Sequence, residues 1–257
     1  MAGSKNVIES SLESQDRLSV FFHLFALSVV PLAASDGRSA NLLISQDADG
    51  SAWLVLAARG GCELGPGVRA SARIDFESLV NPLMRALPDM MKVPLHDNPA
   101  LATVADAFAR ECGGGRCGAP LAADYLGRLL LLMALRHAIE SGVADAGLLA
   151  ALGHPHLYPA LVAIHQNPER QWRSGDLAGL GGISRTQFMT LFARIVGTTP
   201  IAYLNSWRLA LGRRELEKGA RIKTVARQVG YGSAAAFSRA YARAFGHAPI
   251  VARNQTS

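Results

Sequence analysis

Apolar residues recur every third or fourth position through most of the second half of the chain, which is the period of amphipathic helices. The pattern predicts three helices, over residues 157–165, 174–180 and 185–196, and then a long helix that begins at Thr199-Pro200. Residues 222–253 continue with a short helix, a Gly230-Tyr231-Gly232 turn and another helix from Ser233. Two helices joined by such a turn form a helix-turn-helix, which places its second helix in the major groove of DNA.

Shorter stretches in the first half alternate between apolar and polar residues, which is the period of strands. They predict strands over residues 40–45, 52–58 and 68–76. In the last of these, the even-numbered residues from Val68 to Phe76 lie on one face, and Arg69 and Arg73 lie on the other. Helices are expected to follow over residues 75–87, 99–112 and 121–141, the last rich in leucine.

Each predicted second helix of the helix-turn-helix units has one apolar face. In the first unit, Ser184 is the expected N-cap and Gly197 the stop, with Phe188 and Phe192 among the inward residues. In the second unit, Ser233 is the expected N-cap. Its inward residues are expected to be Phe237, Tyr241, Ala244 and Phe245.

The second unit closely resembles the signature of AraC/XylS-type transcription regulators. The resemblance is carried by Ala226, Val229-Gly230-Tyr231, Ser233, Phe237-Ser238-Arg239, Phe245-Gly246, Pro249 and Arg253, and it extends over about the last 100 residues. It implies a second helix-turn-helix unit upstream and a connecting helix that contains Trp207. The first unit departs from the family pattern at Met189-Thr190 and Ala193, and the connecting helix has Gly212 where the family prefers alanine.

The outward faces of the two recognition helices supply candidate DNA contacts. Arginine and glutamine can pair bidentately with guanine and adenine edges, while other arginines contact phosphates and set the register. The residues predicted to bind DNA are Arg185, Gln187, Arg194, Ser238, Arg239 and Arg243. Because a rigid helix between the units can match the spacing of successive major grooves, one chain is expected to read a bipartite promoter site.

The predicted strands resemble the cupin-like sensor domain that precedes the DNA-binding part of many AraC-type regulators. The expected fold class is therefore α+β, with a reduced cupin-like barrel and helices at residues 1–152 and an all-α DNA-binding domain at residues 153–257. The resemblance also implies a homodimer formed through the leucine-rich helix of the N-terminal domain, and contact with RNA polymerase.

The two halves of the chain also differ in net charge. The net charge is +6, yet residues 153–257 hold 14 lysines and arginines against 4 aspartates and glutamates, which leaves the first half acidic. A basic half suggests a polyanionic partner. Residues 18–34 form the most apolar stretch, which is expected to be core because His23 and Pro31 interrupt it. Three cysteines give no disulfide framework, and no membrane segment is expected, so we expect a cytoplasmic protein.

Enzymatic chemistry finds little support in the residues. No P-loop, nucleophile elbow or dinucleotide fingerprint occurs, and three cysteines cannot supply the four-cysteine zinc site of an alkyl-DNA repair methyltransferase. His154 and His156 form an HxH pair, but it lies in a linker outside the predicted barrel. We therefore expect no catalytic residues, no metal and no cofactor.

The pair Arg69 and Arg73 is the clearest candidate ligand-binding site in the predicted sensor domain. It is similar to the RxxxR element with which PilZ-type domains hold cyclic di-GMP, although the second PilZ element is only partial, at Asp49-x-Ser51. Two guanidinium groups can stack on guanines and pair with their edges or with phosphates. This supports the hypothesis of a cyclic di-GMP effector, as in the CuxR type of the family. A solvated strand face, another small effector, thiol oxidation at Cys112 and Cys117, and an effector-independent DNA-binding protein remain alternatives.

Overall fold

The chain folds into two compact units. The computed structural model describes residues 16–25, 27–32, 40–57, 61–62, 65–76, 82, 87, 89–142 and 146–254. Residues Ala26–Leu149 form one unit, here called the sheet unit. Met1–Phe25 and Ala150–Ser257 together form the other, here called the helical unit.

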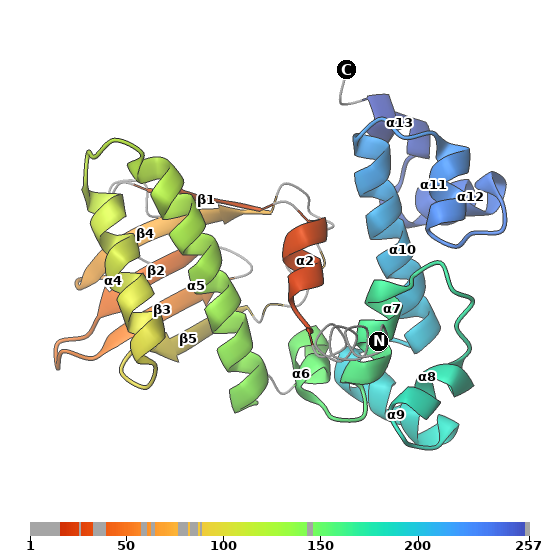
Figure 1. Ribbon diagram of the computed structural model, residues 1–257, viewed down its shortest axis with the longest axis horizontal. Coiled ribbons are helices and arrows are strands. Elements are labelled where there is room, and N and C mark those ends of the chain that lie inside the picture. The colour runs from red at the N-terminus through yellow and green to blue at the C-terminus, as the bar shows by residue number, and fades with distance from the viewer. Residues whose placement is uncertain are drawn as a thin grey trace, which may run out of the picture. The chain divides into compact units, whose positions relative to one another are not determined.

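The sheet unit is built on a five-stranded antiparallel sheet, drawn in Figure 1. Its strands are β1 (Ser28–Pro31), β2 (Leu42–Gln46), β3 (Ala52–Ala57), β4 (Val68–Asp75) and β5 (Met90–Pro94), in the order β1-β4-β2-β3-β5. The three predicted strands are confirmed to within two residues at their ends. Strands β1 and β5, of four and five residues, were not predicted from the sequence.

Two long helices cover one face of this sheet, as Figure 1 shows. Helix α4 (Pro99–Gly113) is capped by Asn98, whose side chain accepts a hydrogen bond from the Leu101 amide. Helix α5 (Ala119–Ser141) follows. Apolar residues of the two helices, including Phe108 and Leu130, are fully buried. The α+β class is confirmed, with the described strands forming one open sheet. The helix expected over residues 75–87 lies mostly outside the described residues, and Asp75 belongs to β4.

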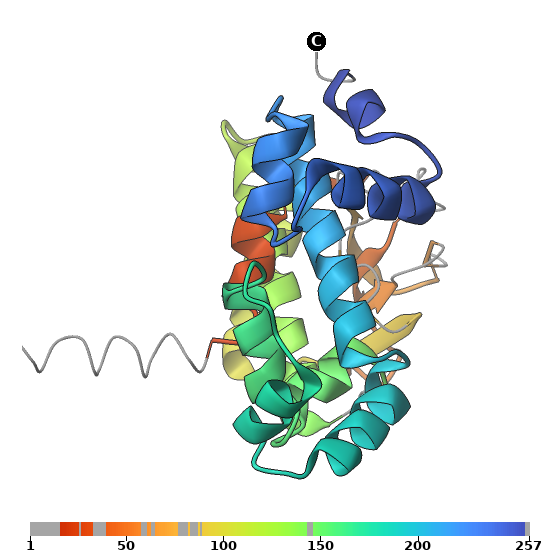
Figure 2. The same ribbon diagram turned by 90° about the vertical axis from the view of Figure 1, so that its right-hand side faces the viewer.

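The helical unit carries the predicted DNA-binding helices. In chain order it contains α2 (Ser19–Leu24), the end of α6 (Gly147–Gly153), α7 (Tyr158–Gln166), α8 (Ser174–Leu180), α9 (Arg185–Val196), α10 (Pro200–Glu217), α11 (Ile222–Gln228), α12 (Ala234–Phe245) and α13 (Pro249–Asn254). Figure 2 shows α8 and α9 at one end of the long helix α10, and α11 and α12 at its other end. Among the described residues, no single helix is long and apolar enough to cross a membrane, although α6 and α7 pass that test as a pair bent by 109°.

The N-terminal segment is placed differently from the expected division at residues 152 and 153. Phe21 is fully buried against helices α7 and α10, with its ring 5.0 Å from that of His165 and 5.4 Å from that of Trp207. Phe25 also contacts Trp207, and Arg17 donates to the Leu152 carbonyl. These contacts assign residues 16–25 to the helical unit. Sequence order could not reveal this, because the segment directly precedes the first strand of the sheet.

Candidate nucleic-acid interface

The first helix-turn-helix consists of α8 and α9. Ser184 caps α9, since its Oγ accepts from the Gln187 amide while the Gln187 side chain accepts from the Ser184 amide at 3.1 Å. Phe188 and Phe192 are fully buried, as predicted. The outward face exposes Arg185, Thr186, Gln187, Thr190 and Arg194.

The capping box gives Gln187 a structural role besides the predicted one. Its Oε1 is engaged by Ser184 through both the amide and the hydroxyl, the latter at 2.8 Å. Bidentate pairing with adenine needs both the oxygen and the nitrogen of a side-chain amide. Without breaking the cap, Gln187 therefore has only its Nε2 donor to offer a base.

The second helix-turn-helix consists of α11 and α12. Ser233 caps α12 by accepting a hydrogen bond from the Ala236 amide at 3.1 Å. Phe237 and Tyr241 are fully buried, and desolvation raises the pKa of Tyr241 to about 12, so this phenol stays neutral. Ala244, which was expected to face inward, is exposed near the C-terminal end of the helix.

The outward face of α12 combines two cations with several methyl groups. Arg239 and Arg243 are exposed four residues apart, hence on one side of the helix, and Ser238 is partly exposed. At its N-terminal end the helix presents Ala234 and Ala235. Arginine suits guanine or phosphate, and alanine methyls suit the methyl group of thymine. The face therefore has the chemistry of a major-groove surface.

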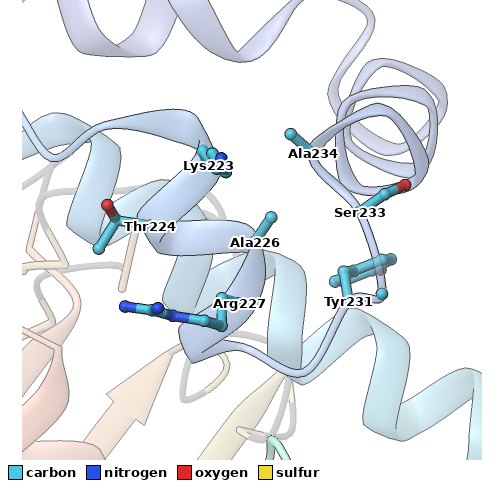
Figure 3. A pocket seen from close by; sticks show the side chains of 8 residues that line it. Lys223, Thr224, Ala226, Arg227, Tyr231, Ser233 and Ala234 are labelled. Atoms are coloured by element: carbon cyan, nitrogen blue, oxygen red, sulfur yellow. The ribbon is translucent and has the colours of Figure 1, made fainter.

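A hollow of about 550 Å³ lies beside the start of α12. Figure 3 shows Lys223 and Arg227 of α11 on one side of it, with Ser233 and Ala234 across from them. In helix-turn-helix proteins the first helix crosses the DNA backbone, where cations bind phosphate. Lys223 and Arg227 were not predicted as site residues, although their spacing of four residues on a helix was available as a signal.

The structure explains the glycine at position 212. A Cβ atom there would lie 2.7 Å from Cε2 and 2.9 Å from Cζ of Phe237, closer than carbon atoms pack. The missing side chain lets α12 approach α10 through Phe237. The helix-propensity cost of about 1 kcal/mol is thus offset by packing.

In the sheet unit, Arg69 and Arg73 are both exposed but differ in surroundings. On β2, Ile44 pairs with Ala70 and Ser45 with Val68, so the register shifts at Arg69, which has no partner residue on that strand. Its Nη2 instead forms an ion pair with Asp106 of α4 at 2.8 Å. Arg73 pairs in register with Val30 of β1. The strict alternation that the sequence predicted is therefore interrupted at Arg69.

The other polar candidates show local structural roles. The Nδ1 atom of His156 lies 2.8 Å from the Gly181 carbonyl oxygen, at the turn of the first unit. Burial and the charge of Glu111 raise the pKa of Cys112 to about 11, which suppresses its thiolate, while Cys117 is exposed. Within the described part of the chain, no three histidine, cysteine, aspartate or glutamate side chains gather as a metal site.

The helical unit thus belongs to the class of DNA-binding domains with two helix-turn-helix units on one long helix. Residues 177–255 match the family described as a helix-turn-helix domain, and residues 70–140 match the cupin family. The match to the cupin family thus lies in the sheet unit and the helix-turn-helix match in the helical unit.

The curated relatives that the chain matches are described as transcription regulators. A protein of Streptomyces lividans described as an AraC-like transcription regulator is 35% identical over 172 residues, which are 65% of this chain and 56% of that protein. The regulator AlkR of Acinetobacter baylyi is 34% identical over 185 residues, 68% of this chain and 59% of that protein. These relatives are transcription regulators, not enzymes. The chain spans less than two thirds of their length.

A solved structure also matches the C-terminal part. The AraC-type DNA-binding protein of Chromobacterium violaceum is 30% identical and covers 40% of this chain and 93% of its own, with a TM-score of 0.38.

Proposed function

We propose that this chain is a DNA-binding transcription regulator of the AraC type that reads a bipartite promoter site and is controlled by a small ligand. The observation that carries the proposal is the pair of N-capped helices α9 and α12, each with a basic outward face. The named function of the relatives supports it. Contact with RNA polymerase and a cytoplasmic location belong to the same proposal.

The first test concerns Arg239 and Arg243. We expect the double substitution Arg239→Ala plus Arg243→Ala to weaken binding to a DNA site selected from a random library by about 2–6 kcal/mol, since each arginine contributes about 1–3 kcal/mol. Fluorescence anisotropy over a series of salt concentrations measures the affinity. If one arginine binds phosphate, the salt dependence also becomes less steep.

The matched control for this test removes the same charge from the sheet unit. Arg110 and Arg136 are exposed on α4 and α5, so Arg110→Ala plus Arg136→Ala lowers the net charge equally. We expect this control to keep nearly all of the affinity. Equal losses in the two double variants would mean that only net charge matters, which contradicts the assignment of α12.

We propose cyclic di-GMP as the effector, bound through Arg73 and Arg69. Both guanidinium groups are exposed, and each can stack on a guanine or pair with a phosphate, which supports this proposal although the register shift at Arg69 breaks the shared face that the sequence predicted. In the free protein Asp106 holds Arg69, so the nucleotide has to displace that carboxylate. Another small effector, and oxidation of the exposed Cys117, are the competing proposals.

Asp106 makes the effector test specific. Asp106→Asn frees Arg69 without removing it, so we expect tighter cyclic di-GMP binding in this variant and weaker binding in Arg69→Ala and Arg73→Ala. Isothermal titration calorimetry on the full chain measures all three. No heat with the unmodified protein, or equal affinity in all variants, would exclude this nucleotide and leave the effector unidentified.

We also propose that the sheet unit forms a homodimer through α5. Leu121, Tyr125 and Leu129 are 58%, 63% and 41% exposed, and their spacing of four residues places them on one face. Leu130, by contrast, is fully buried, so a charge there would disrupt the core rather than an interface. The exposed stripe is the surface that a second copy can cover.

The dimer is tested with Tyr125→Glu, which places a charge in the centre of the stripe. We expect the unmodified protein to sediment as a dimer at micromolar concentration and the variant as a monomer. Arg110→Glu, a change at an exposed polar position of α4, is the control and keeps the dimer. A monomeric unmodified protein, with and without effector, would overturn the proposal.

A further inference from the structure

Arg208 is a buried cation in the middle of α10. It is 6% exposed and has no carboxylate within ion-pair distance among the described residues. Its Nε donates to the Pro168 carbonyl at 2.6 Å, and its Nη2 donates to the Arg170 carbonyl at 2.9 Å. Burying a guanidinium is unfavourable unless its hydrogen bonds are satisfied, so these two carbonyls fix where the side chain lies.

The carbonyls that Arg208 binds belong to the segment that enters the first helix-turn-helix. Residues 167–173 connect α7 to α8, and Figure 1 shows this connection running along α10 before it returns to α8. The segment is ordered by its own contacts. The Trp172 indole donates to the Asn167 carbonyl at 2.9 Å, and the Arg170 guanidinium stacks on Trp172.

The same segment touches the turn of the second helix-turn-helix. Gln171 Nε2 donates to the Gly230 carbonyl at 2.9 Å. Gly230 has φ +83°, and a Cβ atom there would lie 2.7 Å from Cα of Glu169 and 2.8 Å from Nη2 of Arg208. The turn between α11 and α12 is therefore in close contact with both the segment and Arg208.

We infer that Arg208 and residues 167–173, here called the brace, hold the two helix-turn-helix units at one separation and so set the spacing of the two half-sites in DNA. Without the brace, the second unit is held to the first only by its packing on α10, where Phe237 contacts Gly212, and by the short connection to α11. The additional attachment at Gly230 restricts movement of the second unit on α10. This inference rests on the proposed bipartite DNA binding.

The brace predicts a sharp spacing preference that depends on Arg208. When both units are held rigidly, DNA with one base pair inserted or deleted between the half-sites cannot engage both units at once. The gain in affinity from binding both half-sites at once is then lost. We therefore expect the unmodified protein to bind such DNA about 10–100-fold more weakly than DNA with the correct spacing. In Arg208→Met, which keeps the apolar stem without the donors, we expect the three spacings to bind within about threefold of one another.

Gln171→Ala is the second variant, because Gln171 is exposed and its loss does not threaten the fold. It removes the hydrogen bond to Gly230 and a longer one, of 3.5 Å, to the Glu169 carbonyl, and we expect an intermediate spacing preference. Arg110→Ala, at an exposed position of the sheet unit outside the brace and the recognition helices, is the control and keeps the preference of the unmodified protein. A folded Arg208→Met protein with the spacing preference of the unmodified protein would overturn the inference, as would a Gln171→Ala preference identical to it.

A measurement without DNA separates this inference from the proposed function. Spin labels at cysteines introduced for Ala193 of α9 and Ala244 of α12, both exposed, report the distance between the recognition helices once the native cysteines are replaced. Double electron–electron resonance is expected to show a narrow distance distribution that broadens in Gln171→Ala and Arg208→Met. If the distance distributions of both variants equal that of the unmodified protein, the brace is refuted, even if the protein binds DNA. If the distributions broaden but the protein does not bind DNA, only the proposed function is refuted.

Discussion

Phe21→Ala is expected to destabilise the helical unit by about 3–5 kcal/mol, the range for removing a fully buried phenylalanine from a core. The ring of Phe21 is fully buried and makes edge contacts with His165 and Trp207. Alanine would leave a cavity between α2, α7 and α10. Urea denaturation followed by Trp207 fluorescence measures the loss, in a Trp53→Phe, Trp172→Phe background that removes the other two of the three tryptophans.

Phe22 provides the control on the same helix. It is only partly buried, so Phe22→Ala should cost clearly less than Phe21→Ala. If the two variants unfold at the same urea concentration, residues 16–25 do not form part of the helical core. If the prediction holds, a DNA-binding fragment beginning at residue 153 lacks part of its own core.

Lowering the pH from 6.5 to 5 is expected to remove about 2 kcal/mol of stability through His165 alone. Burial lowers the pKa of this imidazole from 6.5 to about 3. Between these values the unfolded chain binds a proton at this position and the folded chain does not, so stability is complete above pH 6.5 and falls as the pH drops. The window stops at pH 5 because most carboxylates titrate at lower pH.

His165→Phe isolates this contribution. The variant keeps an aromatic ring beside Trp207 but has no titrating group, so its stability should change less over the same pH range. Phe22→Ala, a change on α2 that removes no titrating group, should retain the slope of the unmodified protein. Equal slopes in the unmodified and His165→Phe proteins would show that the imidazole binds protons equally in the folded and unfolded states.

The helix-turn-helix units were predictable because their signals are local. Ser184 and Ser233 cap the recognition helices as the sequence indicated, and the apolar periodicity correctly placed Phe188, Phe192, Phe237 and Tyr241 inside. A cap needs only the next three residues and a helix face only one helical turn. Ala244 was misplaced because the end of a helix need not be covered by a neighbour.

The sheet was only partly predictable. Alternation identified β2, β3 and β4, but it placed Arg69 and Arg73 in equivalent surroundings. The register shift opposite Ser45 and the ion pair with Asp106, 37 residues away, depend on pairing between distant segments. Side-chain alternation along one strand contains no information on where a partner strand shifts its register.

By itself, the sequence determined the local elements: the turns, the caps, the amphipathic faces and the basic character of the second half. Only the tertiary structure decided that residues 16–25 complete the helical unit, that Gly212 makes room for Phe237, and that Arg208 binds the carbonyls of Pro168 and Arg170. The physical reason is the range of the interactions. Hydrogen bonds within a turn follow from neighbouring residues, whereas the burial of Phe21 on Trp207 requires the packing of segments almost 190 positions apart.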